Sequence, residues 1–127
     1  MESGKMPGKM RAVHTEISAP FEIGPIHTGT NWPALIFEKW SDSKQTVPED
    51  FMDGTYSMGI YVDPAYLTEV MAIAEGADLV VTDNMIAVYS NEDQSTLPVR
   101  KYFFRILCVV DANDTFQVIH GTLNIVH

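Results

Sequence analysis

Residues 99–126 decide the fold class, and they are VRKYFFRILCVVDANDTFQVIHGTLNIV. Two runs rich in β-branched and aromatic residues, 99–110 and 115–126, flank the turn-forming tetrad Asp111-Ala112-Asn113-Asp114. This pattern is typical of an antiparallel β-hairpin. With the tetrad as its loop, Phe104 faces Gly121 and Ile106 faces Ile119.

The two faces of this hairpin differ along its length. One face carries Tyr102, Phe104, Ile106 and Cys108, opposite Leu123, Gly121, Ile119 and Gln117. The other carries Lys101, Phe103, Arg105, Leu107 and Val109, opposite Asn124, Thr122, His120, Val118 and Phe116. Near the turn both faces are apolar, and such a region is normally covered on both sides. We therefore expect both apolar faces near the turn to pack against the rest of the domain or against a second subunit, as in a homodimer.

The segments before the hairpin mix two kinds of pattern. Asp63, Pro64 and Gly76 bracket a helix predicted over Pro64 to Glu75, with apolar residues at helical spacing. Residues 58–62 and 79–82 are predicted strands, which could form a parallel βαβ unit. Alternatively, Asp83-Asn84 turns the chain into a hairpin with residues 85–89. Residues 34–40 suit a short helix or a strand.

These elements predict an α+β fold: a mainly antiparallel sheet with a C-terminal hairpin, packed against one or two helices. The chain has 127 residues, 46% of them hydrophobic, which suffices for one domain with a real core. We expect a flexible leader over residues 1–11 and a single globular domain over 12–127. No apolar run approaches the roughly 20 residues that cross a bilayer. One cysteine allows no internal disulfide, which fits a cytoplasmic location.

The acidic charge is concentrated in the middle of the chain. The net charge is −9, and residues 45–99 hold no Lys or Arg. Ten acidic residues fall in this interval: Glu49, Asp50, Asp53, Asp63, Glu69, Glu75, Asp78, Asp83, Glu92 and Asp93. Such a surface repels phosphate backbones, so it argues against nucleic-acid binding. We expect either a solubilising surface, or a face that docks on a basic partner or mimics a nucleic acid.

Candidate catalytic groups are sparse. Cys108 and His120 lie on opposite faces of the predicted hairpin, which disfavours a thiol activated by that histidine. The four histidines share no ligand-like spacing, so no metal site is expected. Lys101, Arg105 and His120 share the polar face of the hairpin, where they could bind an anion or pair with the many acids.

Three segments together resemble the catalytic domains of ADP-ribosyltransferases of the poly(ADP-ribose) polymerase type. They are residues 26–30 (IHTGT), residues 56–62 (YSMGIYV), and residues 84–89 (NMIAVY) with Gln94, Pro98 and Tyr102. The resemblance implies an NAD pocket in which His27 bonds the ribose, Gly29 presents its backbone to the nicotinamide amide, and Tyr61 stacks on nicotinamide. Met85 stands where the family has a catalytic glutamate. The resemblance therefore allows a catalytically degenerate domain.

Two functions follow from these patterns. The first is a small acidic, non-enzymatic binding module without a cofactor, which acts on a protein partner or on a second copy of itself. The alternative is the NAD-binding domain that the resemblance implies.

Overall fold

The computed structural model describes residues 9–14, 20–30, 32–42, 44–89 and 96–127. Every regular element in these ranges is a β-strand. The strands are β1 (Lys9–His14), β2 (Phe21–His27), β3 (Ala34–Lys39), β4 (Thr55–Tyr61), β5 (Glu69–Ala74), β6 (Leu79–Thr82), β7 (Met85–Val88), β8 (Arg100–Asp111) and β9 (Asp114–Val126). No helix in the described residues is long and apolar enough to cross a membrane.

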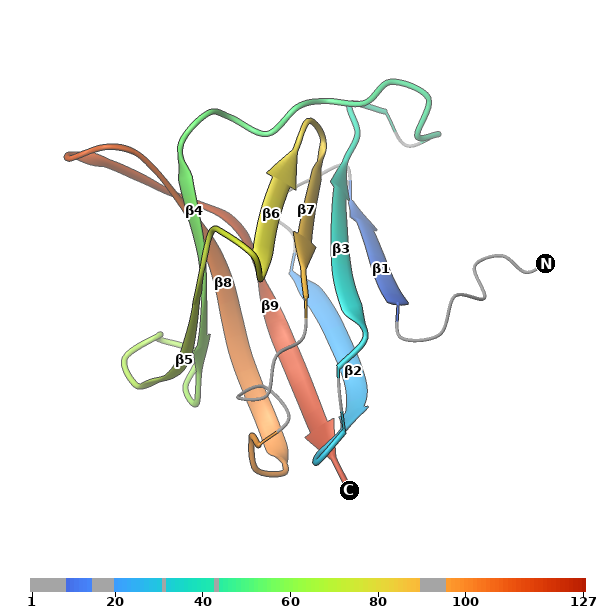
Figure 1. Cartoon of the computed structure of the whole chain (residues 1–127), viewed down its shortest axis with the longest axis vertical. Coiled ribbons are helices and arrows are strands. Elements are labelled where there is room, and N and C mark those ends of the chain that lie inside the picture. Colours follow the sequence, from blue (N-terminus) through green and yellow to red (C-terminus); the bar gives the residue numbers. More distant parts are fainter. Residues whose placement is uncertain (1–8, 15–19, 31, 43, 90–95) are drawn as a thin grey trace.

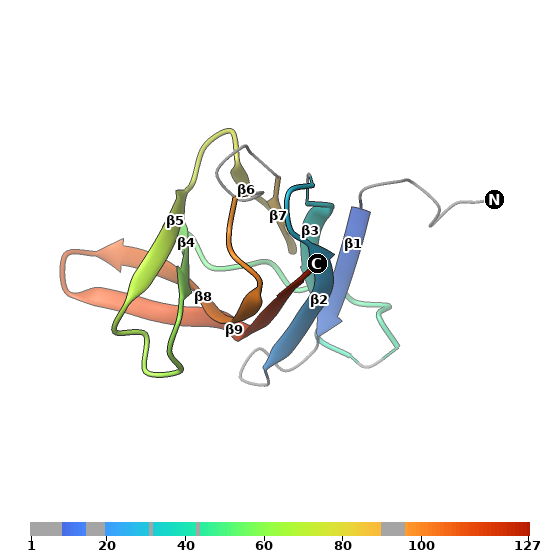
Figure 2. The same cartoon turned by 90° about the horizontal axis from the view of Figure 1, so that it is seen from below.

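The strands form two sheets that face each other (Figures 1 and 2). One sheet has four strands in the order β1-β3-β7-β6, and the other has five in the order β2-β9-β8-β4-β5. The β1–β3 and β2–β9 pairs are parallel, whereas the other pairs are antiparallel. The core lies between the sheets, where Phe37 of β3 meets Phe21 of β2 and Phe104 of β8 at ring-centroid distances of 5.3 and 6.0 Å. Alternate residues of β8 are buried, as a half-buried strand requires.

The predicted C-terminal hairpin is confirmed for most of its length. The pairs Phe104–Gly121, Arg105–His120 and Ile106–Ile119 form as expected. Beyond Ile106 the register shifts by one residue, so Cys108 faces Phe116 rather than Gln117. A bulge at this point adds one residue to β9, and sequence alternation alone does not locate such an insertion.

The predicted helix over Pro64–Glu75 is wrong. Residues 62–68 form a loop, and β5 pairs with β4 in antiparallel register. The Asp63 carboxylate accepts hydrogen bonds from the backbone N–H groups of Leu67 and Thr68, and this caps a loop instead of a helix. Leu67 is 82% exposed, whereas Ile73 is buried against the core. Alternating burial along β5 therefore replaces the helical face that the sequence suggested.

The α+β prediction is wrong as a whole, because the described chain is all-β. The open alternatives resolve toward strands: residues 79–82 and 85–88 form a hairpin, and Ala34–Lys39 is strand β3. The resemblance to ADP-ribosyltransferases is also wrong, because a catalytic domain of that type combines helices with its sheet, whereas every regular element in the described residues is a strand.

The N-terminal segment is described only in part. Strand β1 begins at Lys9, inside the predicted leader, and pairs with β3 from Lys9 to His14. Residues 1–8 lie outside the described residues, as does Gln94 of the third resembling segment.

Candidate functional site

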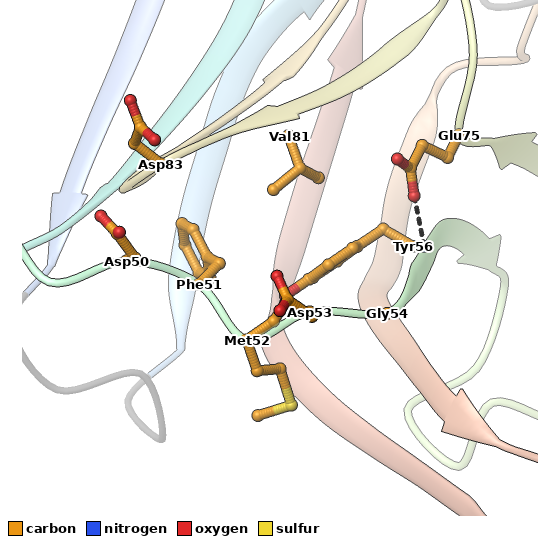
Figure 3. Close-up of a pocket in the computed structure, with 9 residues that line it drawn as sticks. All are labelled: Asp50, Phe51, Met52, Asp53, Gly54, Tyr56, Glu75, Val81 and Asp83. Atoms are coloured by element: carbon orange, nitrogen blue, oxygen red, sulfur yellow. Dashed lines mark hydrogen bonds between the residues drawn. The ribbon is translucent and has the colours of Figure 1, made fainter.

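A cavity of about 260 Å³ opens at one end of the sandwich, between the loop before β4 and the β6–β7 hairpin (Figure 3). Nine residues line it, and we call it the acidic pocket: Asp50, Phe51, Met52, Asp53, Gly54, Tyr56, Glu75, Val81 and Asp83. Four of them are acidic, and none is a lysine or an arginine. The rings of Phe51 and Tyr56 meet edge to face in its wall, with centroids 6.3 Å apart.

Backbone hydrogen bonds hold the three segments of the acidic pocket together. The Phe51 N–H donates to the carbonyl of Asp83 over 2.9 Å, which ties the loop to the β6–β7 turn. Tyr56 N–H donates to the Glu75 carboxylate, and the Glu75 N–H donates to the Tyr56 carbonyl in return. The Tyr56 hydroxyl donates to the carbonyl of Met52 over 2.6 Å. The pocket is thus built into the fold rather than formed by free loop ends.

No lysine or arginine among the residues that line the acidic pocket balances the negative charge of its four carboxylates. Asp50, Asp53 and Asp83 are exposed, so their carboxylates face water. Lys39 contacts the outside of this lining: its Nζ lies 5.8 Å from the Phe51 ring centroid and 3.1 Å from Glu49 Oε2. In the described part of the chain, no group of three or more His, Cys, Asp or Glu side chains is placed to hold a metal ion.

The turn end of the β8–β9 hairpin lies beside this pocket. We call residues 109–116 the hairpin tip, which projects beyond the other strands at the upper left of Figure 1. A Cβ built on Gly54 of the pocket would lie 2.9 Å from the Val109 carbonyl oxygen, so the two features share a boundary. Val109, Val110 and Phe116 are 40%, 46% and 45% exposed. The predicted apolar region near the turn is therefore solvent-facing in this single chain.

The predicted anion-binding residues lie on the outer face of the five-stranded sheet. Arg105 of β8 and His120 of β9 are direct cross-strand partners, and both are partly buried. Lys101 is on the same face but four residues away along β8, about 13 Å at strand rise. It lines a second cavity, of about 320 Å³, at the β2–β9 edge. The structure therefore brings two of the three residues together.

Two tyrosines complete the surroundings of Arg105. Its guanidinium carbon lies 5.3 Å from the ring centroid of Tyr61 and 4.6 Å from that of Tyr66. The two rings meet at 71° with centroids 5.2 Å apart. Burial raises the pKa of the Tyr66 hydroxyl, and the charge of Arg105 partly opposes this shift.

The residues of the implied NAD pocket are not brought together. Tyr61 lies on β4 and is occupied by Tyr66 and Arg105, whereas His27 ends β2, three strands away in the sheet order. Three strand spacings amount to about 14 Å. The His27 ring donates from Nδ1 to the backbone carbonyl oxygen of His127 over 2.6 Å, and Gly29 occupies a turn with φ of 79°. His27 therefore binds the backbone near His127, and Gly29 forms a turn, so neither residue lies in a common pocket with Tyr61.

The structure agrees with the prediction about the cysteine but contains a pocket that the sequence analysis did not predict. Cys108 is buried and its thiol contacts the backbone carbonyl oxygen of Asp53, while His120 lies on the opposite sheet face, as predicted. The acidic pocket was missed. Its residues are spread from Asp50 to Asp83, and only the strand pairing brings them together. The absence of cations between residues 45 and 99 was the sequence signal that pointed to it.

Comparisons with known proteins add little to this geometry. No protein-family model and no curated protein matches the chain. Among solved structures, the V domain of amphioxus IgVJ-C2 is similar at 12% identity and a TM-score of 0.28, over 80% of this chain and 97% of that one. A likeness at this level carries no conclusion about function.

Proposed function

We propose that this protein is a non-enzymatic binding module that recognises a protein segment bearing basic and apolar side chains. The observation that carries the proposal is the position of the acidic pocket directly beside the exposed hairpin tip. Together these two features form one continuous surface, which we call the acidic end.

Electrostatics supports a cationic occupant for the pocket. Four carboxylates surround a cavity that no cationic side chain lines. A cleft lined by charges of one sign concentrates ligands of the opposite sign and raises their association rate. The same field repels phosphate backbones, which favours a protein over a nucleic acid as partner.

The aromatic wall favours an ammonium or guanidinium group in particular. A cation within about 6 Å of an aromatic ring centroid is attracted by the ring quadrupole. Lys39 already makes this contact with Phe51 while pairing with Glu49, so the chain contains its own example of the chemistry. A lysine or arginine side chain of a partner would meet the same two types of group inside the pocket.

The hairpin tip supplies the apolar part of the surface. Aromatic and aliphatic side chains at the centre of an interface, surrounded by polar groups, contribute most of the binding free energy. Phe116 and Val110 occupy such a position, and Asp111 and Asp114 at the turn provide the polar surroundings. A partner with alternating cationic and apolar side chains would satisfy both halves of the acidic end.

The chemistry of the chain also favours binding over catalysis. Its one thiol, Cys108, is enclosed in the core and separated from His120 by the sheet. A buried thiol without an adjacent base is a poor nucleophile. The proposal therefore requires no cofactor, and it includes the cytoplasmic location expected from the cysteine content.

Calorimetry with a short peptide of alternating lysine and leucine tests the proposal. We expect saturable binding to the wild type, and about tenfold weaker binding to D53N/D83N, since two charge contacts of a few tenths to 1 kcal/mol each are lost. Asn tolerates the left-handed conformation of Asp83, where φ is 52°, so the backbone should be kept. The matched control E22Q/E69Q removes two charges on other strands. Equal loss in both variants, or no binding to the wild type, would contradict the proposal.

The partner could also be a second copy of this chain. A homodimer that pairs two acidic ends face to face would bring like charges together, which costs free energy. A second copy would instead have to present the outer face of its five-stranded sheet, which carries Arg105. Light scattering of the wild type and of V110K should show whether the apolar tip drives such assembly: loss of a dimer in V110K supports it, and an unchanged dimer places the contact elsewhere.

A further inference from the structure

The strongest unassigned feature of the molecule lies on the sheet face away from the acidic end. Arg105 sits on β8, with Gly59 of β4 and His120 of β9 as its cross-strand partners. Strand β8 is the middle strand of the five, so this position is framed by neighbours on both sides. An arginine here is presented by the central strand of the sheet.

The missing side chain of Gly59 leaves room for an aromatic ring. A Cβ built on Gly59 would lie 2.5 Å from the Tyr61 hydroxyl oxygen and 2.7 Å from its ring. The Tyr61 ring therefore lies back over Gly59, toward Arg105, at a guanidinium-to-centroid distance of 5.3 Å. Any larger residue at position 59 would displace it.

The second ring is brought in by the β4–β5 loop. Tyr66 adopts a left-handed backbone conformation with φ of 59°, and its N–H donates to the Asp63 carbonyl. The Asp63 carboxylate accepts from Leu67 and Thr68 and so fixes the loop that carries Tyr66. A strained non-glycine backbone that is held by several hydrogen bonds is characteristic of a functional position.

Arg105 itself is held in place by its neighbours but has no anionic partner among the described residues. Its Nε is buried and makes no hydrogen bond within the described residues. None of the carboxylates in that part of the chain forms an ion pair with it. Because an unpaired buried donor lowers stability, internal hydrogen bonding does not explain why an arginine occupies this position. Its cross-strand partner on β9 is His120, whose ring N–H is a second potential donor.

We propose that Arg105 and His120 form a binding site for an oxyanion, a carboxylate or a phosphate. The rings of Tyr61 and Tyr66 lie 5.3 and 4.6 Å from the guanidinium carbon, and the edge of a guanidinium carries its Nη donors. That edge is the direction in which a guanidinium binds an oxyanion in bidentate fashion. Stacking restrains the side chain before binding, so little rotamer freedom is lost when the ligand arrives. Tyr61 and Tyr66 are positioning residues in this site.

The oxyanion could come from a free small anion or from a carboxylate side chain of a second copy of this chain. The site lies away from the acidic end, so it stands independently of the proposed function. The two sources differ in their effect on mass: a free anion leaves the protein monomeric, whereas a second copy raises its mass with concentration.

Nuclear magnetic resonance titration with inorganic phosphate, and separately with acetate, tests the site. We expect saturable shifts of the backbone amides of Gly59, Arg105 and His120 at millimolar anion. R105Q should bind about 10- to 100-fold more weakly, the range for losing hydrogen bonds to a charged group. H120Q should give a smaller loss. K44Q removes one positive charge from an exposed loop and should bind as the wild type does.

Three results would overturn the site. They are the absence of saturable shifts in the wild type, equal shifts in wild type and R105Q, and a loss in K44Q as large as that in R105Q. If R105Q fails to fold, R105K serves instead, because it keeps the charge but loses the bidentate fork. It should bind phosphate more weakly than the wild type while K44Q does not. Sedimentation of the wild type over a concentration series, with and without phosphate, separates the two sources: phosphate should dissociate any dimer held at Arg105.

Discussion

Gly121 marks the closest approach of β2 to β9. A Cβ at this position would lie 2.0 Å from the Phe21 carbonyl oxygen, and the contacted atoms belong to the backbone. We expect G121A to lower the free energy of unfolding by about 3 kcal/mol, the upper end of the usual cost of overpacking, because β2 must move away from β9. Urea denaturation measures this, with T122A on the neighbouring, outward-facing residue as control. A midpoint for G121A equal to that of T122A would show that β2 is not held at this distance.

Tyr56 couples stability to alkaline pH. Burial raises the pKa of its hydroxyl from the ordinary value of 10.0, and the neighbouring Cys108 and Glu75 raise it further. Because the folded pKa lies above the unfolded one, the neutral hydroxyl stabilises the protein fully below pH 10.0. This contribution is lost as the pH rises through the folded value.

The variant Y56F separates the hydrogen bond from the titration. It leaves the Met52 carbonyl without its donor, so we expect a loss of about 1 kcal/mol at neutral pH. Above pH 10.0 its stability should fall less steeply than that of the wild type, because one buried phenol no longer ionises. Guanidinium unfolding at neutral and alkaline pH measures both effects. Parallel pH profiles would assign the alkaline loss to other groups, such as Tyr102, whose pKa burial also raises.

At the level of elements, local sequence signals were reliable where they agreed with strand pairing. The alternation in residues 100–106 predicted the inner faces of β8 and β9 correctly, because one buried face fixes the register. The signals at Asp63, Pro64 and Gly76 fitted a helix, but these residues lie in the loops on either side of β5. Pairing with β4 buries Ile73, and this tertiary contact outweighs the helical propensity of the segment.

The loop between β4 and β5 depends on the Asp63 carboxylate. Hydrogen bonds from the backbone N–H groups of Leu67 and Thr68 favour the charged form of this carboxyl and so lower its pKa. We expect D63A to free the loop, so that the amides of Leu67 and Thr68 exchange faster and Tyr66 loses its contact with Arg105. Hydrogen exchange followed by nuclear magnetic resonance measures this. D63N keeps an acceptor oxygen and should retain most of the protection; equal exchange in D63A and wild type would contradict the role of Asp63.

The arrangement of the whole molecule was the least predictable level. The β2–β9 and β4–β8 pairs join strands far apart in sequence, and no local pattern encodes these two pairings. The acidic pocket depends on that order, since Tyr56, Glu75 and Asp83 meet only after β4, β5 and β6 are in place. By contrast, the uneven charge distribution was visible in the sequence, because it needs no knowledge of contacts.

This charge distribution predicts that salt acts on stability and on binding in opposite directions. The net charge of −9 makes the folded chain repel itself, so we expect sodium chloride to raise the melting temperature as it screens that repulsion. The same screening should weaken binding of the lysine–leucine peptide at the acidic end, because the screening length falls from about 30 Å at 0.01 M to about 10 Å at 0.1 M salt. Differential scanning calorimetry and titration calorimetry over one salt series measure both.

Comparing D53N/D83N with the wild type tests whether the salt dependence of peptide binding comes from the acidic end. Removing two carboxylates should flatten the salt dependence of peptide binding, whereas E22Q/E69Q, with the same change in net charge, should leave it as steep as in the wild type. Both variants should shift the salt dependence of the melting temperature to a similar extent, because that quantity reports the total charge. Identical binding slopes for the two variants would mean that the peptide responds to net charge alone, and recognition by the acidic end would then be wrong.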